Sequence, residues 1–121
     1  MKTILVVEDS RLTFELLRRA LAPSQRYSVE FFCKNAENLM EVYEQNRPDI
    51  VVMDIVMEET SGIDLTRTLV KAHPEARVVI LSSLSFQEVQ DMAAQAGAVG
   101  YIHKPFVAED VIRAFDRALM A

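Results

Sequence analysis

The sequence predicts an α/β fold, a doubly wound parallel sheet of five strands with helices on both faces. Five short, apolar and largely β-branched runs recur at regular intervals, and segments with helical periodicity lie between them. Strands that are apolar throughout are typical of a parallel sheet buried on both faces. Strict alternation of strand and helix is typical of βαβ units, so the sheet should carry helices on both sides.

The predicted strands are the short apolar runs themselves. In order, they cover residues 4–7, 29–33, 50–53, 78–81 and 99–102. Glu30 interrupts the second run, and we therefore expect this strand to be the weakest and to lie at an edge of the sheet.

The predicted helices each carry an apolar stripe at a spacing of three or four residues. Ser10 and Ser61 are candidate N-caps of the first and third helices, Pro23 follows the first helix, and Gly97 fits the end of the fourth. The stripes are Leu12, Leu16, Leu17, Ala20 and Leu21; Leu39, Val42 and Tyr43; Ile63, Leu65, Leu69 and Val70; Val89, Met92, Ala93 and Ala96; and Val111, Ile112, Phe115 and Leu119.

Length and charge narrow the class of protein. The 121 residues fit one domain, which we expect to cover residues 1–121. The net charge is −5 and no Lys/Arg cluster is present, so we expect no direct nucleic-acid binding. No apolar run approaches the ~20 residues of a membrane span. The N-terminal apolar run is too short for a signal peptide, and Cys33, the single cysteine, fits a small buried side chain. We expect a cytoplasmic protein.

Polar side chains follow four of the predicted strands. The carboxyl ends of parallel strands meet at one edge of the sheet, where doubly wound folds bind their ligands. The candidate site residues are Glu8 and Asp9 after the first strand, Asp54 after the third, Ser82 and Ser83 after the fourth, and Lys104 and Pro105 after the fifth.

These residue types suit phosphoryl chemistry. Three crowded carboxylates raise one another's pKa values, and a hard cation such as Mg²⁺ relieves that conflict through its oxygen ligands. A carboxylate such as Asp54 can attack phosphorus and form an aspartyl phosphate. Lys104 would supply positive charge to a transferring phosphoryl group, and Ser82 a hydroxyl donor.

Each residue also has a structural interpretation. Asp9 can cap the first helix, Asp54 can be an ordinary turn residue, Ser82 can provide loop polarity, and Lys104 can be a solvated surface charge. The joint pattern, with every group at the same edge of the predicted sheet, favours a functional site.

The sequence resembles the receiver domain of two-component response regulators over essentially its whole length. The matching segments are ILVVEDS (4–10), DIVVMDIVM (49–57), Gly62, VILSS (79–83) and AGAVGYIHKPF (96–106). The resemblance implies a flavodoxin-like strand order, 2-1-3-4-5, and a signalling switch rather than an enzyme.

The resemblance also implies roles for individual residues. Asp54 would be the phosphoacceptor, and Mg²⁺ would be held by Asp54, Glu8, Asp9 and the backbone carbonyl of Val56. Ser82, Ser83 and Lys104 would bind the phosphoryl group. Ser82 and Tyr101 would form the switch pair, and the Lys104–Pro105 bond would be cis.

Partners follow from the same resemblance. A histidine kinase or a histidine phosphotransfer domain would donate the phosphoryl group and dock at the start of the first helix. The output partner is unknown; it would read the face made by the fourth helix, fifth strand and fifth helix. The sequence fits both a stand-alone receiver and the amino-terminal part of a longer regulator. Dimerisation of the kind found in the winged-helix transcription factors is disfavoured. That group usually carries an acidic pair and an arginine where this sequence has Val99, Gly100 and Ala114.

The sequence departs from the usual pattern of the family at three positions. Glu58 stands where Pro is frequent, Glu8 where Asp is commoner, and Ser83 where Ala is frequent.

Two classes of enzyme are disfavoured. The turn after the first strand lacks the glycines of a dinucleotide-binding enzyme. Val56 replaces the second catalytic Asp of haloacid-dehalogenase phosphatases. Val56 and Leu84 are apolar beside the expected path of hydrolytic water, which predicts slow self-dephosphorylation.

Overall fold

The structure, a computed structural model, describes residues 1–57 and 60–121. Five parallel strands form one sheet in the order β2-β1-β3-β4-β5, which confirms the predicted fold class and strand order. Glu58, which stands where Pro is frequent in the family, lies outside the described residues. The strands are β1 (Lys2–Val7), β2 (Tyr27–Cys33), β3 (Ile50–Asp54), β4 (Val78–Ser82) and β5 (Gly100–His103).

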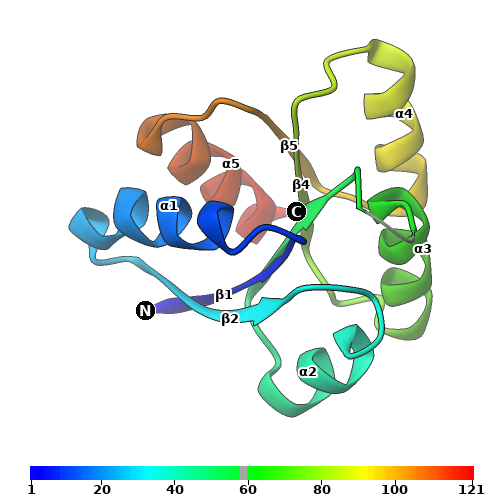
Figure 1. The fold of residues 1–121 in the computed structure, drawn as a ribbon, viewed down its shortest axis with the longest axis horizontal. Helices are drawn as coiled ribbons and strands as arrows, with labels where there is room; N and C mark the ends of the chain where they lie inside the picture. The colour runs from blue at the N-terminus through cyan, green and yellow to red at the C-terminus, as the bar shows by residue number, and fades with distance from the viewer. Residues whose placement is uncertain (58–59) are drawn as a thin grey trace.

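Helices cover both faces of the sheet. Figure 1 shows α1 and α5 on one side and α2, α3 and α4 on the other. Alternate residues of the strands point to the two faces, so Ile4 and Val6 join the core under α1 and α5, while Leu5 and Val7 join the core on the other side. The helices are α1 (Arg11–Leu21), the short 3₁₀ helix η1 (Ala22–Ser24), α2 (Leu39–Asn46), α3 (Gly62–Ala72), α4 (Gln87–Ala96) and α5 (Ala108–Met120).

The second strand is an edge strand, as predicted, and it contains a bulge. Ile4 pairs with Val29 and the next residue, Leu5, pairs with Phe31, so Glu30 is the extra residue of β2. Glu30 is exposed. The bulge allows a charged residue to interrupt an otherwise apolar strand without entering the core.

Two predicted helix stripes are partly wrong. In α1 the buried residues are Phe14, Leu17 and Leu21, whereas Leu12 is 66% and Leu16 46% exposed. At about 100° per residue, Leu12 and Leu16 lie on nearly the opposite side from Phe14, so α1 has two apolar faces and only one packs on the sheet.

The fourth helix buries a smaller face than predicted. Ala93 and Ala96 are buried, whereas Met92 is 51% exposed. The fifth strand also begins one residue later than predicted, at Gly100, and leaves Val99 exposed.

The helix ends agree with the sequence signals except at Ser10. The hydroxyl oxygen of Ser61 accepts a hydrogen bond from the Ile63 amide at 3.1 Å, and Gly97 ends α4 with a φ of 114°. Ser10 occupies the N-cap position of α1, but its side chain makes no capping hydrogen bond. Among the described residues, no helix combines the length and apolar character needed to cross a membrane.

Candidate functional site

The site lies at the carboxyl edge of the sheet, where four strands end. Glu8 and Asp9 directly follow β1, Asp54 is the last residue of β3, and Lys104 directly follows β5. Each of the three carboxylates has an oxygen within 4.8 Å of those of the other two. The structure therefore brings together the acidic residues that the sequence predicts.

The carboxylates are not ordinary surface charges. Glu8 is 3% exposed and Asp54 is 8% exposed. The residues that directly precede them, Ile4–Val7 of β1 and Ile50–Met53 of β3, are all buried, so the sheet itself carries both carboxylates into the interior. Burial of two carboxylates side by side requires either a shared proton or a cation.

Within residues 1–57 and 60–121, one cationic side chain, Lys104, reaches both buried carboxylates. The Nζ atom of Lys104 lies 3.2 Å from Oε1 of Glu8 and 3.8 Å from Oδ1 of Asp54. The hydroxyl of Thr13, in the first turn of α1, also donates to Oε1 of Glu8, at 2.8 Å. The other oxygen of Glu8, Oε2, is buried and has no donor among the described residues.

The carboxylates shift one another's pKa in opposite directions. Burial and the neighbouring Glu8 carboxylate raise the pKa of Asp54 to about 7, against the opposing effect of Lys104. Burial also acts to raise the pKa of Glu8, but the neighbouring Asp54, the hydrogen bond from Thr13 and the Lys104 ammonium outweigh burial and hold the pKa of Glu8 below its usual value. Near neutral pH, the pair therefore holds a proton mainly on Asp54.

The acidic cluster fits a divalent cation. A hard cation accepts several oxygen ligands, and the cluster offers three carboxylates together with an orphaned, buried oxygen of Glu8. A cation would also displace the proton that Asp54 retains. The donor set is therefore one that could hold a metal ion.

A close backbone contact joins the start of α3 to the end of β3. The amide of Gly62 donates to the carbonyl of Ile55 at 2.8 Å. A Cβ atom at Gly62 would lie 1.9 Å from the carbonyl oxygen of Asp54, so only glycine fits where α3 begins. Val56 and Ser61 pair in an isolated antiparallel bridge, and the side chain of Val56 is exposed.

The predicted switch residues are linked through the backbone of one residue, Leu84. The hydroxyl oxygen of Ser82 accepts the amide N–H of Leu84 at 3.1 Å, and the hydroxyl of Tyr101 donates to the Leu84 carbonyl at 2.7 Å. Ser82 is buried and Tyr101 is partly buried. Ser83, in contrast, is exposed.

The fifth strand leads into a cis peptide. The Lys104–Pro105 bond is cis, and the amide of Lys104 donates to the carbonyl of Ser82 at 2.9 Å. This hydrogen bond ties the end of β5 to the end of β4, so Lys104 and Ser82 belong to the same edge of the site.

Two features of the site were not foreseen from the sequence. One is the contact between Thr13 and Glu8, because the side-chain spacings of three and four residues within a helix do not predict a hydrogen bond to a residue that lies outside the helix. The other is the steric role of Gly62, which the sequence indicated only as part of a resemblance.

The comparisons with known proteins agree with this geometry. The family model of the response regulator receiver domain matches residues 4–116. The chemotaxis protein CheY of Thermotoga maritima is 32% identical over 96% of this chain and 96% of its own length. The CheY of Halobacterium salinarum is 33% identical over 99% of this chain and 98% of its own.

A solved structure shows the same fold. A two-component response regulator of the LuxR family from Aurantimonas sp. SI85-9A1 superposes with a TM-score of 0.90 at 28% identity, covering 98% of this chain and 84% of its own. The acidic cluster at the sheet edge, the family match and these relatives lead to one conclusion: the chain belongs to the response regulator receiver domain family, the signalling switches of two-component systems.

Proposed function

We propose that Asp54 is the phosphoacceptor of this receiver and that Glu8, Asp9 and Asp54, with the backbone carbonyl of Val56, hold one Mg²⁺. The observation that carries the proposal is the setting of Asp54. It ends β3, is 8% exposed, belongs to a cluster of three carboxylates, and has the Lys104 ammonium 3.8 Å away.

The proposed reaction is transfer of a phosphoryl group from a phosphohistidine. A carboxylate oxygen of Asp54 attacks phosphorus, an O–P bond forms, the N–P bond of the donor breaks, and the imidazole leaves with its electron pair and takes up a proton. Lys104 and the Ser82 hydroxyl bind oxygens of the transferring group, and Ser83 borders it. Mg²⁺ would supply further neutralisation of the phosphoryl charge.

The raised pKa of Asp54 explains why the neighbouring charges matter. With a pKa of about 7, a large share of Asp54 is protonated at neutral pH, and a protonated carboxyl is a poor nucleophile. Positive charge beside Asp54 favours the ionised, reactive form. Lys104 supplies part of that charge, and a bound cation would supply the rest.

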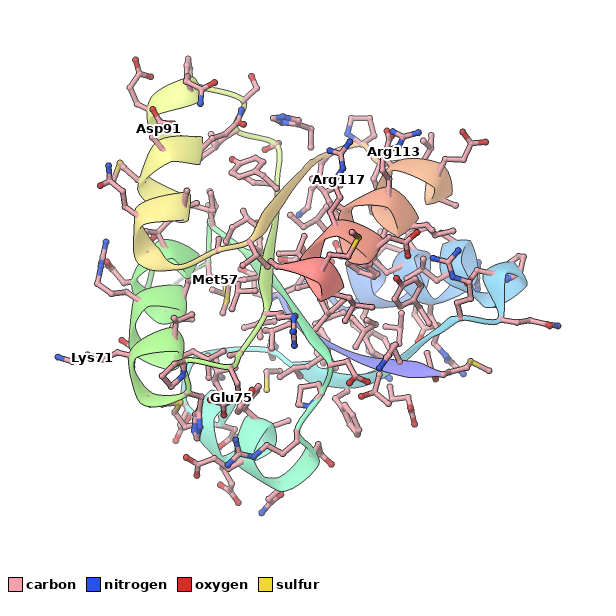
Figure 2. The ribbon with its side chains drawn as sticks, turned by 180° about the vertical axis from the view of Figure 1, so that it is seen from behind. Met57, Lys71, Glu75, Asp91, Arg113 and Arg117 are labelled. Atoms are coloured by element: carbon pink, nitrogen blue, oxygen red, sulfur yellow. The ribbon has the colours of Figure 1, made fainter. Side chains whose placement is uncertain are left out.

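The proposed switch runs through Leu84. If the Ser82 hydroxyl turns toward the phosphoryl group, its oxygen releases the backbone N–H of Leu84, the residue whose carbonyl oxygen accepts the hydrogen bond of the Tyr101 hydroxyl. Such a movement alters the face made by α4, β5 and α5. Figure 2 shows Asp91 on α4 and Arg113 and Arg117 on α5, on either side of β5.

The surface of α1, beside Asp54, suits docking of the phosphoryl donor. Receiver domains take phosphoryl groups from histidine kinases, and we propose that a histidine kinase or a phosphotransfer domain docks on α1. The exposed Leu12 and Leu16 offer apolar contact there. A mostly apolar groove of about 350 Å³ continues from α1 to the acceptor edge and is lined by Thr13, Leu16, Ala20, Lys104, Pro105 and Phe106.

Intact-mass spectrometry tests the proposal. With acetyl phosphate and Mg²⁺, the protein should gain one phosphoryl group, and it should gain none with EDTA or after Asp54→Asn. Asp64→Asn is the matched control because Asp64 is an exposed aspartate of α3, and this variant should be modified like the parent. Equal modification of the Asp54→Asn variant would overturn the proposal.

A further inference from the structure

The carboxylate of Glu8 is held by side chains from outside β1, the strand that Glu8 follows. Its side chain has one more rotatable bond than Asp, and yet it is 3% exposed in a crowded acidic cluster. Its two oxygens have different surroundings: Oε1 accepts hydrogen bonds from Thr13 and Lys104, whereas Oε2 is buried and meets no donor in the part of the chain that the structure describes. The orientation of the carboxylate therefore depends on the two donors that hold Oε1.

Thr13 is the more rigid of these donors. It belongs to the first turn of α1, and its β-branched side chain has few rotamers in a helix. Lys104 has a long, flexible side chain that also lies near Asp54 and, in the proposed function, turns to the phosphoryl group. Once Lys104 has turned, the hydroxyl of Thr13 is the donor that still holds Oε1 of Glu8.

The hydroxyl of Thr13 is also used differently from the threonine hydroxyls of α3. Thr66 and Thr68 donate to backbone carbonyls four residues earlier, at 2.7 and 3.1 Å, which is the usual contact of a threonine within a helix. Thr13 instead donates to a carboxylate outside its helix, at 2.8 Å.

We infer that Thr13 is a positioning residue of the metal site: its hydroxyl holds Oε1 of Glu8 and thereby keeps Oε2 for the cation or for a water bound to the cation. This inference rests on the proposed function, because it takes the acidic cluster to be a cation site. It assigns Thr13 no contact with the cation or with the phosphoryl group.

Calorimetric titration with Mg²⁺ tests the inference. Loss of an outer hydrogen bond to a ligand commonly weakens metal binding by about 10-fold or more, so Thr13→Val should raise the Kd for Mg²⁺ by about tenfold. Thr13→Ser keeps the hydroxyl and should remain close to the parent. Thr68→Val removes the same group from an exposed position on α3 and should leave the Kd unchanged.

A double-mutant cycle shows whether the effect passes through Glu8. In the Glu8→Asp background the shortened side chain no longer reaches Thr13, so adding Thr13→Val should have no further effect on the Kd. Far-ultraviolet circular dichroism checks that every variant is folded; if Thr13→Val is not, the cycle is run with Thr13→Ala.

The outcomes separate this inference from the proposed function. A parent that does not bind Mg²⁺ contradicts the proposed function and the inference with it. A parent that binds Mg²⁺, with a folded variant lacking the hydroxyl that binds equally well, overturns the inference alone. An equal loss of affinity in the Glu8 and the Glu8→Asp backgrounds also overturns it, because the effect would not pass through Glu8.

Discussion

Replacing Asp54 with Asn should stabilise the metal-free protein, and the gain should grow as the pH rises from about 5 to about 8. Burial and the neighbouring Glu8 raise the pKa of Asp54 from 3.8 to about 7. The folded protein therefore keeps a proton that the unfolded chain releases, and the free energy of unfolding falls as the pH rises through this window. Asn cannot ionise, so the variant avoids this loss.

The raised pKa sets the size of the effect. A rise of about 3 pKa units corresponds to about 4 kcal/mol, at about 1.4 kcal/mol per unit. Part of this gain is offset, because Asp54 helps to lower the pKa of Glu8 and because Lys104 loses one of its two carboxylate neighbours. We expect a net gain of about 2 kcal/mol at about pH 8 and a clearly smaller gain at about pH 5.

Urea unfolding followed by far-ultraviolet circular dichroism measures this difference, with EDTA present to remove divalent cations. Asp91→Asn is the control, because Asp91 is exposed on α4, and its effect on stability should be small at both pH values. A stability difference between the parent and Asp54→Asn that is the same at both pH values would refute the reasoning.

Two further predictions concern the surroundings of Asp54. Gly62→Ala should destabilise the fold by about 2 kcal/mol or more, because the new Cβ would lie 1.9 Å from the Asp54 carbonyl oxygen. Thermal unfolding checks this against Gly100→Ala, where the nearest atom is a side-chain carbon of Val79 at 3.3 Å, and equal losses would contradict it. Val56→Asn and Leu84→Glu should each speed decay of the phosphorylated protein severalfold by orienting a water molecule. Time-resolved intact-mass spectrometry measures the decay, and unchanged lifetimes would show that these apolar side chains do not exclude water.

The strands were predictable because strands of a sheet buried on both faces are apolar throughout, which is easily recognised in a sequence. The run at 50–53 is apolar throughout, and in the structure the corresponding strand, β3, is buried over its whole length. The helix faces were less predictable. In α1, periodicity alone could not decide between the face of Phe14 and Leu17 and the face of Leu12 and Leu16, because both are apolar.

The residues of the site were predictable from the edge of the sheet at which each strand ends. Their interactions were not, because these depend on side-chain directions and on distances of a few ångströms. The hydrogen bond from Thr13 to Glu8, and the lack of a donor for Oε2 among the described residues, can be seen only in the three-dimensional structure. The raised pKa of Asp54 likewise depends on how deeply Asp54 is buried and how close Glu8 lies.

Localisation of the phosphoryl group tests the central claim most directly. After reaction with acetyl phosphate and Mg²⁺, borohydride reduces an aspartyl phosphate to homoserine, and peptide sequencing by mass spectrometry identifies the converted residue. The account predicts conversion at Asp54 alone, and none when EDTA replaces Mg²⁺. Conversion at another carboxylate, or an Asp54 that stays unmodified while the protein gains a phosphoryl group elsewhere, would contradict it.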